Sequence, residues 1–537
     1  MEFLFYQKIC KLRRLTIYLQ YYIMYNLQDT SLEWALLHVI NYYDSDFFPR
    51  LFEFEAIKRD WLNIKPYLLS LDLDSYAPKN PVILLALKSN GTYRVVHQLD
   101  PIDSLIFTAL LYENATIIES YRIPESRKIA CSYRIKLDTN GSFFDKANVA
   151  YLDFLEKSEE LSKRDSVGVV LVCDIVDFYN QIYLHRVNNV LSEAGSKAGK
   201  VIESFLAGLN TNVSRGLPVG PAPSILIAEA IMGDIDKKIL SYTDLFARYV
   251  DDIYIFFTNS YEAKFFLHEL TKYLYSTHRL VLSSDKTELV SVNIFKKKYL
   301  KEGGKVEKQA IHEKLKELAE GDYPLPEEIK EFDDLNSPDK IKIRSKVYSE
   351  LLQKAVTFDT IDLGLMRHIL RQAGRYKVRS LIPQIFENFD TLLPVIREIV
   401  IYFEKVLSEK IVIRYNDEFK KLLDNPSLKL PYINMWVYTL FQNELFNTID
   451  LKIDYSKIFR IREKALIAKR EKNLTWLKDI KDGLDTLGVW DRRAVIYSSI
   501  ILSEDEMKHW LGLESSKGDI LSKAVCSMTI SDKKTGK

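Results

Sequence analysis

Two adjacent carboxylates stand in the sequence where a hydrophobic hairpin is expected to turn. Tyr249-Val250-Asp251-Asp252 lies between the apolar runs Leu245–Ala247 and Ile253–Phe257, and the second run is rich in aromatic and β-branched residues, as strands are. Two neighbouring negative charges add nothing to the packing of such a hairpin. A pair of divalent cations about 3.5–4 Å apart, held by carboxylates, would explain them, because that arrangement serves nucleotidyl transfer. Taken alone, the four residues also fit a polar turn.

A third carboxylate follows an apolar segment upstream. Val167–Val172 is a continuous apolar run, as expected of a strand buried on both faces, and it leads through Cys173 into Asp174. The stretch between Asp174 and Asp251 is long enough for two helices and a return strand. The two residues can therefore lie on adjacent strands and share Mg²⁺, which takes few protein carboxylates together with substrate phosphates. In isolation, Asp174 also fits a strand-end cap or a turn residue.

A loop rich in glycine and proline lies between the two acidic sites. Arg215–Ser224 contains two Gly and three Pro, which predicts a rigid and sharply shaped loop. Ser224 is expected to cap a helix that runs through Ile225–Met232. Backbone without bulky side chains can closely approach a base pair or a phosphate, although an ordinary Pro-rich connector would have the same composition.

These three segments, in this order and spacing, resemble the palm motifs of a reverse transcriptase. Asp174–Tyr179 resembles the first catalytic motif, Arg215–Ser224 the Gly-x-Pro-x-Gly-x-x-x-Ser motif and Tyr249–Asp252 the Tyr-x-Asp-Asp motif. The resemblance implies catalysis by Asp174, Asp251 and Asp252 with two Mg²⁺ ions, or with Mn²⁺. The metal ligands implied in this way are Asp174, Asp251, Asp252 and Ile175.

Other segments resemble parts of this family that contact the nucleotide. Leu282–Leu289 resembles the motif whose Lys lies near the triphosphate, and Lys88–Arg94 resembles the fingers hairpin whose Lys and Arg grip it. Asn90-Gly91 favours a hairpin turn there, and Arg forks match phosphate oxygens; solvated basic residues are the alternative for both segments. The aromatic Tyr179 is implied to crowd a 2′-hydroxyl and so to select deoxynucleotides, or else it is a buried packing residue. The implied substrate-binding residues are Lys88, Arg94, Tyr179, Gly220 and Lys286, and the implied nucleic-acid contacts of the palm are Arg215, Pro218 and Ser224.

The whole chain predicts an α+β fold in which a right-hand polymerase fingers and palm, like that of a reverse transcriptase, precede an all-α region. Its 537 residues allow two or three domains, and 47% hydrophobic residues allow sizeable cores. We expect an N-terminal extension over 1–80, fingers and palm over 81–300, and an α-helical thumb and repeat domain over 301–537. A polar break at Lys301–Lys305 marks the change, and helical periodicity from Ile341 onward suggests a HEAT-like repeat array. An irregular helical bundle is the alternative.

Four arginines in the helical region recur every four residues. Arg367, Arg371, Arg375 and Arg379 would form one ridge of a continuous helix, and their mutual repulsion would be relieved by an anionic partner. This spacing predicts contact of Arg367 and Arg371 with nucleic acid, whereas pairing with acidic neighbours is the alternative. The net charge of +1 excludes a basic field over the whole protein, so nucleic acid must be held in local basic grooves.

Cysteine usage and the N-terminal segment bear on location. Four scattered Cys without a Cys-x-x-Cys pair favour neither zinc nor disulfides and fit a reducing cytoplasm. Basic residues interrupt the aromatic segment 1–24, so no membrane span is expected.

A palm followed by a helical-repeat tail resembles the abortive-infection and defence-associated bacterial reverse transcriptases. That resemblance implies an RNA-directed DNA polymerase, a nucleotidyltransferase that makes DNA from dNTPs in antiphage defence, on a noncoding RNA or without a nucleic-acid template. Implied partners are RNA, DNA, a second polymerase subunit and further copies of the chain. One alternative is a non-catalytic palm scaffold that binds RNA and proteins. Another is an RNA-dependent RNA polymerase, against which Tyr179 and the Tyr-Val-Asp-Asp sequence argue.

Overall fold

The chain forms two compact units that alternate along the sequence. The computed structural model describes residues 25–42, 45, 47–145, 147–211, 213–301, 338–357 and 362–536. The first unit comprises Met1–Asp44, Trp61–Pro81 and Leu99–Val292, and the second comprises Ser45–Asp60, Val82–Gln98 and Asn293–Lys537. Segment 1–24 and all but the first residue of the predicted polar break at 301–305 lie outside the described residues.

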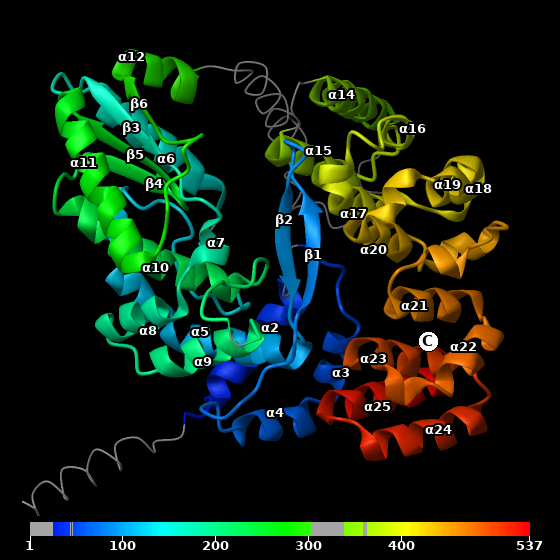
Figure 1. Cartoon of the computed structure of the whole chain (residues 1–537). Helices are drawn as coiled ribbons and strands as arrows, with labels where there is room; N and C mark the ends of the chain where they lie inside the picture. Colours follow the sequence, from blue (N-terminus) through cyan, green and yellow to red (C-terminus); the bar gives the residue numbers. More distant parts are fainter. Residues whose placement is uncertain are drawn as a thin grey trace, which may run out of the picture. The chain divides into compact units, whose positions relative to one another are not determined.

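An antiparallel sheet of four strands forms the centre of the first unit, in the order β4-β5-β3-β6 (Figure 1). The strands are β3 (Val169–Cys173), β4 (Phe246–Tyr249), β5 (Asp252–Phe257) and β6 (Glu288–Ser291). Every residue of Ile253–Phe257 is buried. Helix α6 (Ala147–Ser162) packs on β4 and β5, and α11 (Ser260–Tyr273) packs on β3 and β5. Because both faces of β5 are covered, the strand is apolar throughout rather than alternating.

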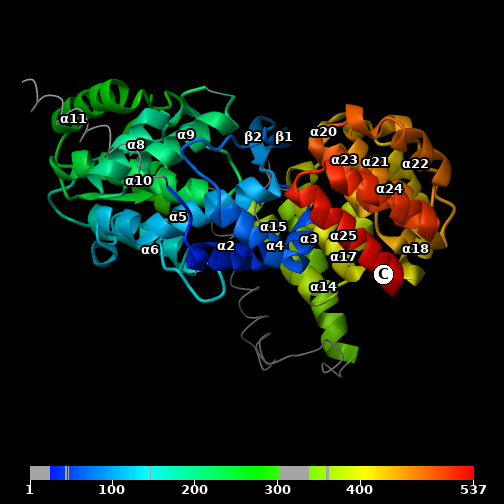
Figure 2. The same cartoon turned by 90° about the horizontal axis from the view of Figure 1, so that it is seen from below.

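Two long helices of the first unit, α5 (Pro101–Tyr121) and α10 (Ala222–Leu240), pack on each other. Helix α5 also packs on α2 (Asp29–Asn41), and the same helices are seen from below in Figure 2. Asp100 fixes the start of α5, because its side chain accepts a hydrogen bond from the Ile102 N–H at 3.1 Å and proline follows at the favoured first position. The remaining helices of this unit are α4 (Trp61–Leu69), α7 (Phe178–Gln181), α8 (Leu184–Glu193) and α9 (Gly199–Leu209).

The second unit contains the predicted hairpin at Asn90-Gly91. Strands β1 (Val82–Leu87) and β2 (Tyr93–Gln98) pair antiparallel, with Leu87 opposite Tyr93. Gly91 has φ +77°, a conformation that glycine adopts without steric cost, and the Lys88 N–H donates to the Thr92 carbonyl at 2.8 Å. The turn predicted from the sequence is confirmed.

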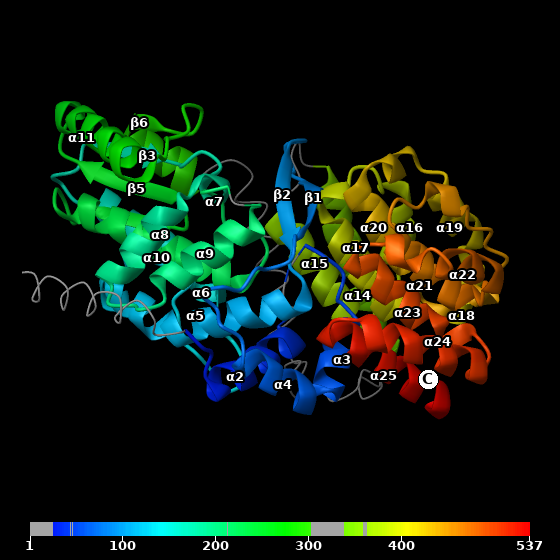
Figure 3. The same ribbon diagram turned by 60° about the horizontal axis from the view of Figure 1, so that its bottom comes forward.

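Helices make up the rest of the second unit, and neighbours in the chain pack on one another (Figure 3). In chain order, α15 packs on α17, α17 on α20, α20 on α21, α21 on α23 and α23 on α25, and α25 also packs on α3. Pro431 starts α20 at the first helical position, which proline favours. The elements are α3 (Glu53–Arg59), α12 (Val292–Phe295), α14 (Pro338–Val356), α15 (Leu363–Arg375), α16 (Leu381–Glu387), α17 (Ile396–Val406), α18 (Glu409–Arg414), α19 (Asn416–Leu423), α20 (Pro431–Leu440), α21 (Ile461–Glu471), α22 (Leu474–Lys481), α23 (Val489–Ser498), α24 (Glu504–Lys517) and α25 (Ile520–Thr535).

Among the described residues, no helix has both the length and the apolar character that crossing a bilayer requires.

Candidate active site

The register of the central sheet brings the predicted carboxylates to one edge. Strands β3 and β5 are antiparallel, and their last pair is Cys173 with Ile253, so Asp174 and Asp252 are the next residues of the two strands. Asp251 is the second residue of the two-residue turn that joins β4 to β5, where Tyr249 pairs with Asp252. The strand–turn–strand structure predicted around Tyr249–Asp252 is confirmed.

Lys286 lies against the first of these carboxylates. Its Nζ is 3.1 Å from both oxygens of Asp174. Burial opposes the charge on Lys286, but Asp174 outweighs burial and raises the pKa of the lysine, so the ammonium stays protonated. The loop that carries Lys286 is tied to the Asp174 segment by the backbone, because the Ser283 N–H donates to the Asp174 carbonyl at 2.8 Å.

The carboxylates repel one another despite this lysine. Desolvation and then the charges of Asp251 and Asp174 raise the pKa of Asp252 to about 7. Asp252 retains exposed surface, so water screens part of the repulsion. The edge of the sheet carries more negative charge than Lys286 neutralises.

A divalent cation fits this donor set. Mg²⁺ is usually held by one or two carboxylates together with waters and substrate phosphates. Within the described residues, no group of three or more His, Cys, Asp or Glu side chains, these three aspartates included, is arranged to hold a metal ion by itself. Asp174, Asp251 and Asp252 would therefore hold such an ion jointly with phosphate oxygens of the substrate.

The Gly/Pro loop lies against the segment that follows Asp174. The Leu217 N–H donates to the Tyr179 carbonyl at 2.9 Å, and the Gly216 N–H donates to the Ile182 carbonyl at 2.8 Å. Gly216 has φ +100° and Gly220 φ +131°, a backbone region that favours glycine. The structure thus brings the backbone of Tyr179 and this loop together.

The predicted start of the next helix is wrong. Helix α10 begins at Ala222 after Pro221, with Pro223 in its first turn, because proline fixes a helical φ and its missing N–H is not needed there. Ser224 therefore lies inside the helix. It is fully buried, and its hydroxyl has no hydrogen-bond partner in the described part of the chain. Pro218 is also buried, whereas Arg215 is exposed.

The other predicted binding residues belong to the second unit. Arg94 is exposed on β2, and Lys88 is half-buried at the turn of the hairpin. Arg367 and Arg371 both approach Glu398, at 3.5 Å and 3.4 Å. Helix α15 ends at Arg375, so the expectation that Arg379 continues the same ridge is wrong.

Sequence reasoning missed a buried charged cluster beneath the turn that carries Asp251. Arg248 is fully buried in β4, and its guanidinium forms a two-pronged ion pair with Asp236, with both contacts at 2.8 Å. Glu229 lies 3.0 Å from the same guanidinium. A signal was present in the sequence, because Glu229 and Arg248 each interrupt an apolar run, and buried charges require partners.

The turn above this cluster is strained. Val250 has φ +57°, a left-handed conformation that is an outlier for a β-branched residue and costs on the order of 1–3 kcal/mol. Such a conformation persists only where the surrounding structure over-determines it.

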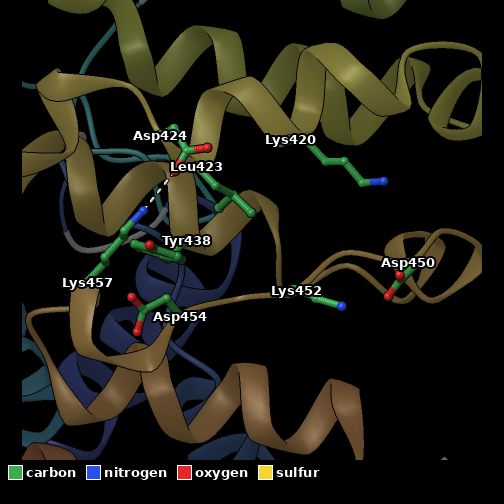
Figure 4. Close-up of a pocket in the computed structure, with 8 residues that line it drawn as sticks. All are labelled: Lys420, Leu423, Asp424, Tyr438, Asp450, Lys452, Asp454 and Lys457. Atoms are coloured by element: carbon green, nitrogen blue, oxygen red, sulfur yellow. Dashed lines mark hydrogen bonds and ion pairs between the residues drawn. The ribbon is translucent and has the colours of Figure 1, made fainter.

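A pocket of about 380 Å³ lies in the second unit, and Figure 4 shows its lining. The lining residues are Lys420, Leu423, Asp424, Tyr438, Asp450, Lys452, Asp454 and Lys457. Lys457 pairs with Asp424 at 2.8 Å. Lysines and aspartates are equal in number here, so the pocket does not present a field of one sign to an anion.

Comparisons with known proteins relate part of the chain to one family. Residues 85–330 match the family profile described as reverse transcriptase (RNA-dependent DNA polymerase). A comparison with curated protein sequences finds no match. Similar solved structures include a telomerase from Candida albicans in complex with a TWJ fragment of telomeric RNA, at 12% identity and a TM-score of 0.30, covering 64% of this chain and 65% of that chain. An apo telomerase from Candida tropicalis has 12% identity and a TM-score of 0.32, covering 68% of this chain and 69% of that one.

Likeness at these TM-scores adds no argument, so the assignment depends on the family match. The matched residues include the strands and the turn that carry Asp174, Asp251 and Asp252. The chain therefore carries a reverse transcriptase domain, the domain of an RNA-directed DNA polymerase, over residues 85–330.

Proposed function

We propose that the protein is an RNA-directed DNA polymerase that adds deoxynucleotides by two-metal catalysis and acts in antiphage defence in the cytoplasm. The observation that carries the polymerase assignment is the meeting of Asp174, Asp251 and Asp252 at one edge of the sheet inside the matched domain. Bound divalent cations would activate the primer hydroxyl and neutralise the charge that develops on the transferring phosphoryl group. The three carboxylates would hold these cations together with Ile175, which directly follows Asp174 in the chain.

Basic residues orient the triphosphate in this proposal. Lys88 and Arg94, on the hairpin of the second unit, bind phosphate oxygens, for which the Arg fork is suited. Lys286 leaves Asp174 for the departing pyrophosphate and supplies its proton. Gly220 leaves room for the nascent base pair, and the exposed Arg215 contacts the nucleic-acid backbone.

Incorporation of labelled nucleotides tests the proposal. Purified protein with Mg²⁺ is incubated with dNTPs or with rNTPs, each with and without an RNA template. Incorporation of dNTPs that ceases on chelation of the metal is expected. If neither nucleotide is incorporated, the polymerase proposal is wrong and a non-catalytic scaffold takes its place. The arms without template show whether a noncoding RNA is required.

Replacement of Tyr179 by Ala is expected to weaken discrimination against rNTPs. Tyr179 is half-buried beside the Gly216–Leu217 backbone, where its ring would meet a 2′-hydroxyl. The ratio of kcat/KM for dNTP to that for rNTP should fall roughly 10- to 100-fold, the range for one steric contact in a pocket. The neighbouring exposed Tyr183 provides the control Tyr183→Ala, for which the ratio should not change. An unaltered ratio in Tyr179→Ala would remove Tyr179 from sugar selection.

The arginines of the second unit support a nucleic-acid contact. Guanidinium groups of Arg367, Arg371 and Arg397 all approach one oxygen of Glu398, at 3.5, 3.4 and 2.9 Å. The Glu398 side chain is only 2% exposed, while that of Arg371 is 56% exposed. One buried carboxylate thus gathers three guanidiniums, and the cluster keeps a net positive charge that faces solvent. We propose that this cluster, on a helical array of HEAT-like kind, holds the phosphate backbone of the template or product strand.

Reversal of two of these charges is expected to weaken binding of single-stranded nucleic acid. A plot of the logarithm of the association constant against the logarithm of salt concentration has a negative slope. In Arg367→Glu/Arg371→Glu, the magnitude of this slope should decrease by about two, because each lost phosphate contact decreases it by about one. Fluorescence anisotropy with a labelled oligonucleotide measures this slope. Lys452→Glu reverses an exposed charge of the same unit in the pocket of Figure 4 and should leave the slope unchanged. An equal slope in all three proteins would contradict the proposed contact.

The defence role is supported by the resemblance of the palm motifs and of the helical tail to defence-associated reverse transcriptases. Phage plating on cells that express the wild type or an Asp251→Asn variant tests it, with protection expected only from the wild type. Co-purification of RNA, of a second polymerase subunit or of further copies of the chain would identify the proposed partners.

A further inference from the structure

In the turn that carries Asp251, both backbone polar groups of the strained residue Val250 are hydrogen-bonded to side chains. The Val250 N–H donates to Ser132 Oγ at 2.9 Å, and the Val250 carbonyl accepts from Arg248 Nη1 at 2.8 Å. Ser132 and Arg248 are both fully buried. Asp251 is the next residue of the chain, so the peptide group that precedes the predicted metal ligand is fixed by side chains that come from the interior.

The fold explains how Ser132 reaches the turn. Ala130 forms a parallel bridge with Arg248, and the Cys131 N–H donates to the Arg248 carbonyl at 3.0 Å. The segment that contains Ser132 therefore runs beside β4 in the same direction. Ser132 follows Ala130 by two residues, just as Val250 follows Arg248, and this register places the serine hydroxyl next to the turn.

Two acidic residues of α10 bind the two side chains, Ser132 and Arg248, that contact Val250. Asp236 binds the Arg248 guanidinium at two points, each at 2.8 Å. Glu229 accepts from Ser132 Oγ at 2.6 Å and from Arg248 Nη2 at 3.0 Å. The Arg122 guanidinium is 2.7 Å from Glu229 and donates to the Ser132 carbonyl at 2.7 Å. Every hydroxyl and guanidinium that touches Val250 thus has a second bond that fixes its direction.

The charges of this cluster balance one another. Arg122 and Arg248 face Glu229 and Asp236, and all four residues are at most 3% exposed. Arg122 also pairs with Glu119, and Glu119 in turn pairs with Arg134, so the added charges balance as well. Burial opposes the charge on Arg248, but Asp236 and Glu229 outweigh burial and raise its pKa. A balanced and buried set of charges has no surface for substrate, which excludes direct contact with the nucleotide and leaves support of the turn as its role.

We propose that Ser132 and Arg248 are positioning residues, which hold Val250 in its left-handed conformation and so aim Asp251 at the reacting phosphate. We call Ser132, Arg248 and the acidic residues that hold them, Glu229 and Asp236, the clamp. Helix α10, which carries both acidic residues, begins directly after the Gly/Pro loop. The clamp therefore links the loop proposed to support the nascent base pair with the turn that carries Asp251. The inference rests on the polymerase function proposed above. Its physical basis is that a strained turn relaxes once its restraints are removed, and a misplacement of about 1 Å can cost on the order of 100-fold in rate.

Removal of the serine hydroxyl tests the clamp. Ser132→Ala is expected to lower kcat about 10- to 100-fold while the KM for dNTP changes by less than about threefold, because the groups that bind the triphosphate are elsewhere. Ser196→Ala is the matched control. Ser196 is a buried serine of the same unit that donates to Asn114 at 2.5 Å and accepts from the Ala198 N–H at 3.0 Å. Ser196→Ala loses the same kinds of hydrogen bond as Ser132→Ala and should retain the kcat of the wild type.

A second substitution separates positioning from a general loss of stability. Glycine adopts φ near +57° without steric cost, so Ser132→Ala/Val250→Gly should regain at least about threefold in kcat over Ser132→Ala. Val250→Ala in the same background keeps a Cβ and should give no gain. If kcat in Ser132→Ala equals that of the wild type, or if Val250→Gly brings no recovery, the clamp is overturned.

Hydrogen–deuterium exchange distinguishes failure of the clamp from failure of the proposed function. The Val250 amide hydrogen is bonded to Ser132, so a peptide that covers Tyr249–Ile253 should exchange faster in Ser132→Ala than in the wild type or in Ser196→Ala. This readout needs no polymerase activity. Faster exchange in an inactive wild-type background would retain the clamp and reject the polymerase, whereas unchanged exchange would reject the clamp whatever the activity.

Discussion

Asp251→Asn is expected to reduce dNTP incorporation roughly a thousandfold, equivalent to about 4 kcal/mol of transition-state stabilisation. Asparagine has nearly the same shape as aspartate, and Val250 keeps its two hydrogen bonds, so the turn should persist. The lost charge matters because a divalent cation at this edge depends on few carboxylates. Steady-state incorporation of labelled dNTP with Mg²⁺ measures the effect.

Asp244→Asn is the matched control for this variant. Asp244 is an exposed carboxylate just before β4, 3.8 Å from Arg127, and its replacement removes one negative charge from the same hairpin. Its activity should stay within about twofold of the wild type, as expected for a surface residue away from the site. Activity of Asp251→Asn within tenfold of the wild type would show that Asp251 is not required for the chemistry.

Asp251→Asn should also lower the pKa of the neighbouring Asp252. Asp251 is one of the charges that raise the pKa of Asp252 to about 7. Without it, Asp252 should ionise at a lower pH. Loss of activity together with this shift would assign the defect to a missing ligand rather than to an unfolded turn.

The sheet edge that carries Asp174, Asp251 and Asp252 could be predicted from the sequence because its signals are local. An aspartate after an apolar strand, and a polar pair between two apolar runs, each restrict their own neighbourhood. The register that brings Asp174 next to Asp252 follows from those strands. Asn90-Gly91 was predictable for the same reason, since its turn chemistry involves few residues.

The start of α10 and the end of α15 show where local signals compete. Ser224 is a good capping residue, but Pro221 and Pro223 start the helix earlier because proline already has a helical φ. In α15, Gly374 packs closely on Tyr402 and Lys405 of α17, and the helix ends one residue later. The spacing of four arginines carries no information about this tertiary contact, so it predicted a ridge that was too long.

The interleaved units could not be predicted, because contacts between distant segments define them. Glu53 and Arg462 are 409 residues apart and form a two-pronged ion pair at 2.6 and 2.8 Å. Neither residue has a neighbour in the sequence that indicates the other. Segment Ser45–Asp60 is consequently part of the second unit, although sequence reasoning assigned it to an N-terminal extension.

This ion pair gives the largest stability effect that we expect. Glu53→Gln should destabilise the second unit by about 3–5 kcal/mol, because it leaves buried guanidiniums opposite a neutral amide. Glu53 is fully buried in α3, Arg462 is 5% exposed and Arg493, 3.5 Å from the same carboxylate, is fully buried. Chemical unfolding followed by intrinsic tryptophan fluorescence measures the change, and Trp490, whose ring centroid is 5.8 Å from Arg462 Cζ, is one of the six tryptophans that contribute to the signal.

Glu55→Gln supplies the comparison on the same helix. Glu55 pairs with Arg59 at 2.8 Å at the surface, with 49% of its side chain exposed, and such i,i+4 pairs contribute only about 0.3–0.5 kcal/mol. If Glu53→Gln lowered the free energy of unfolding by as little as Glu55→Gln, a structural role for the buried ion pair would be contradicted.

The pH dependence follows from the same geometry. Burial alone would raise the pKa of Glu53, but Arg462 outweighs it and lowers that pKa below its ordinary value. A folded-state pKa below the unfolded value means that the stabilisation is fully present above the unfolded pKa, which is about 4.3. It is lost as pH falls through the lower folded-state pKa. The difference between wild type and Glu53→Gln should therefore be constant from neutral pH down to about 5 and should shrink below about 4, which unfolding curves at successive pH values would detect.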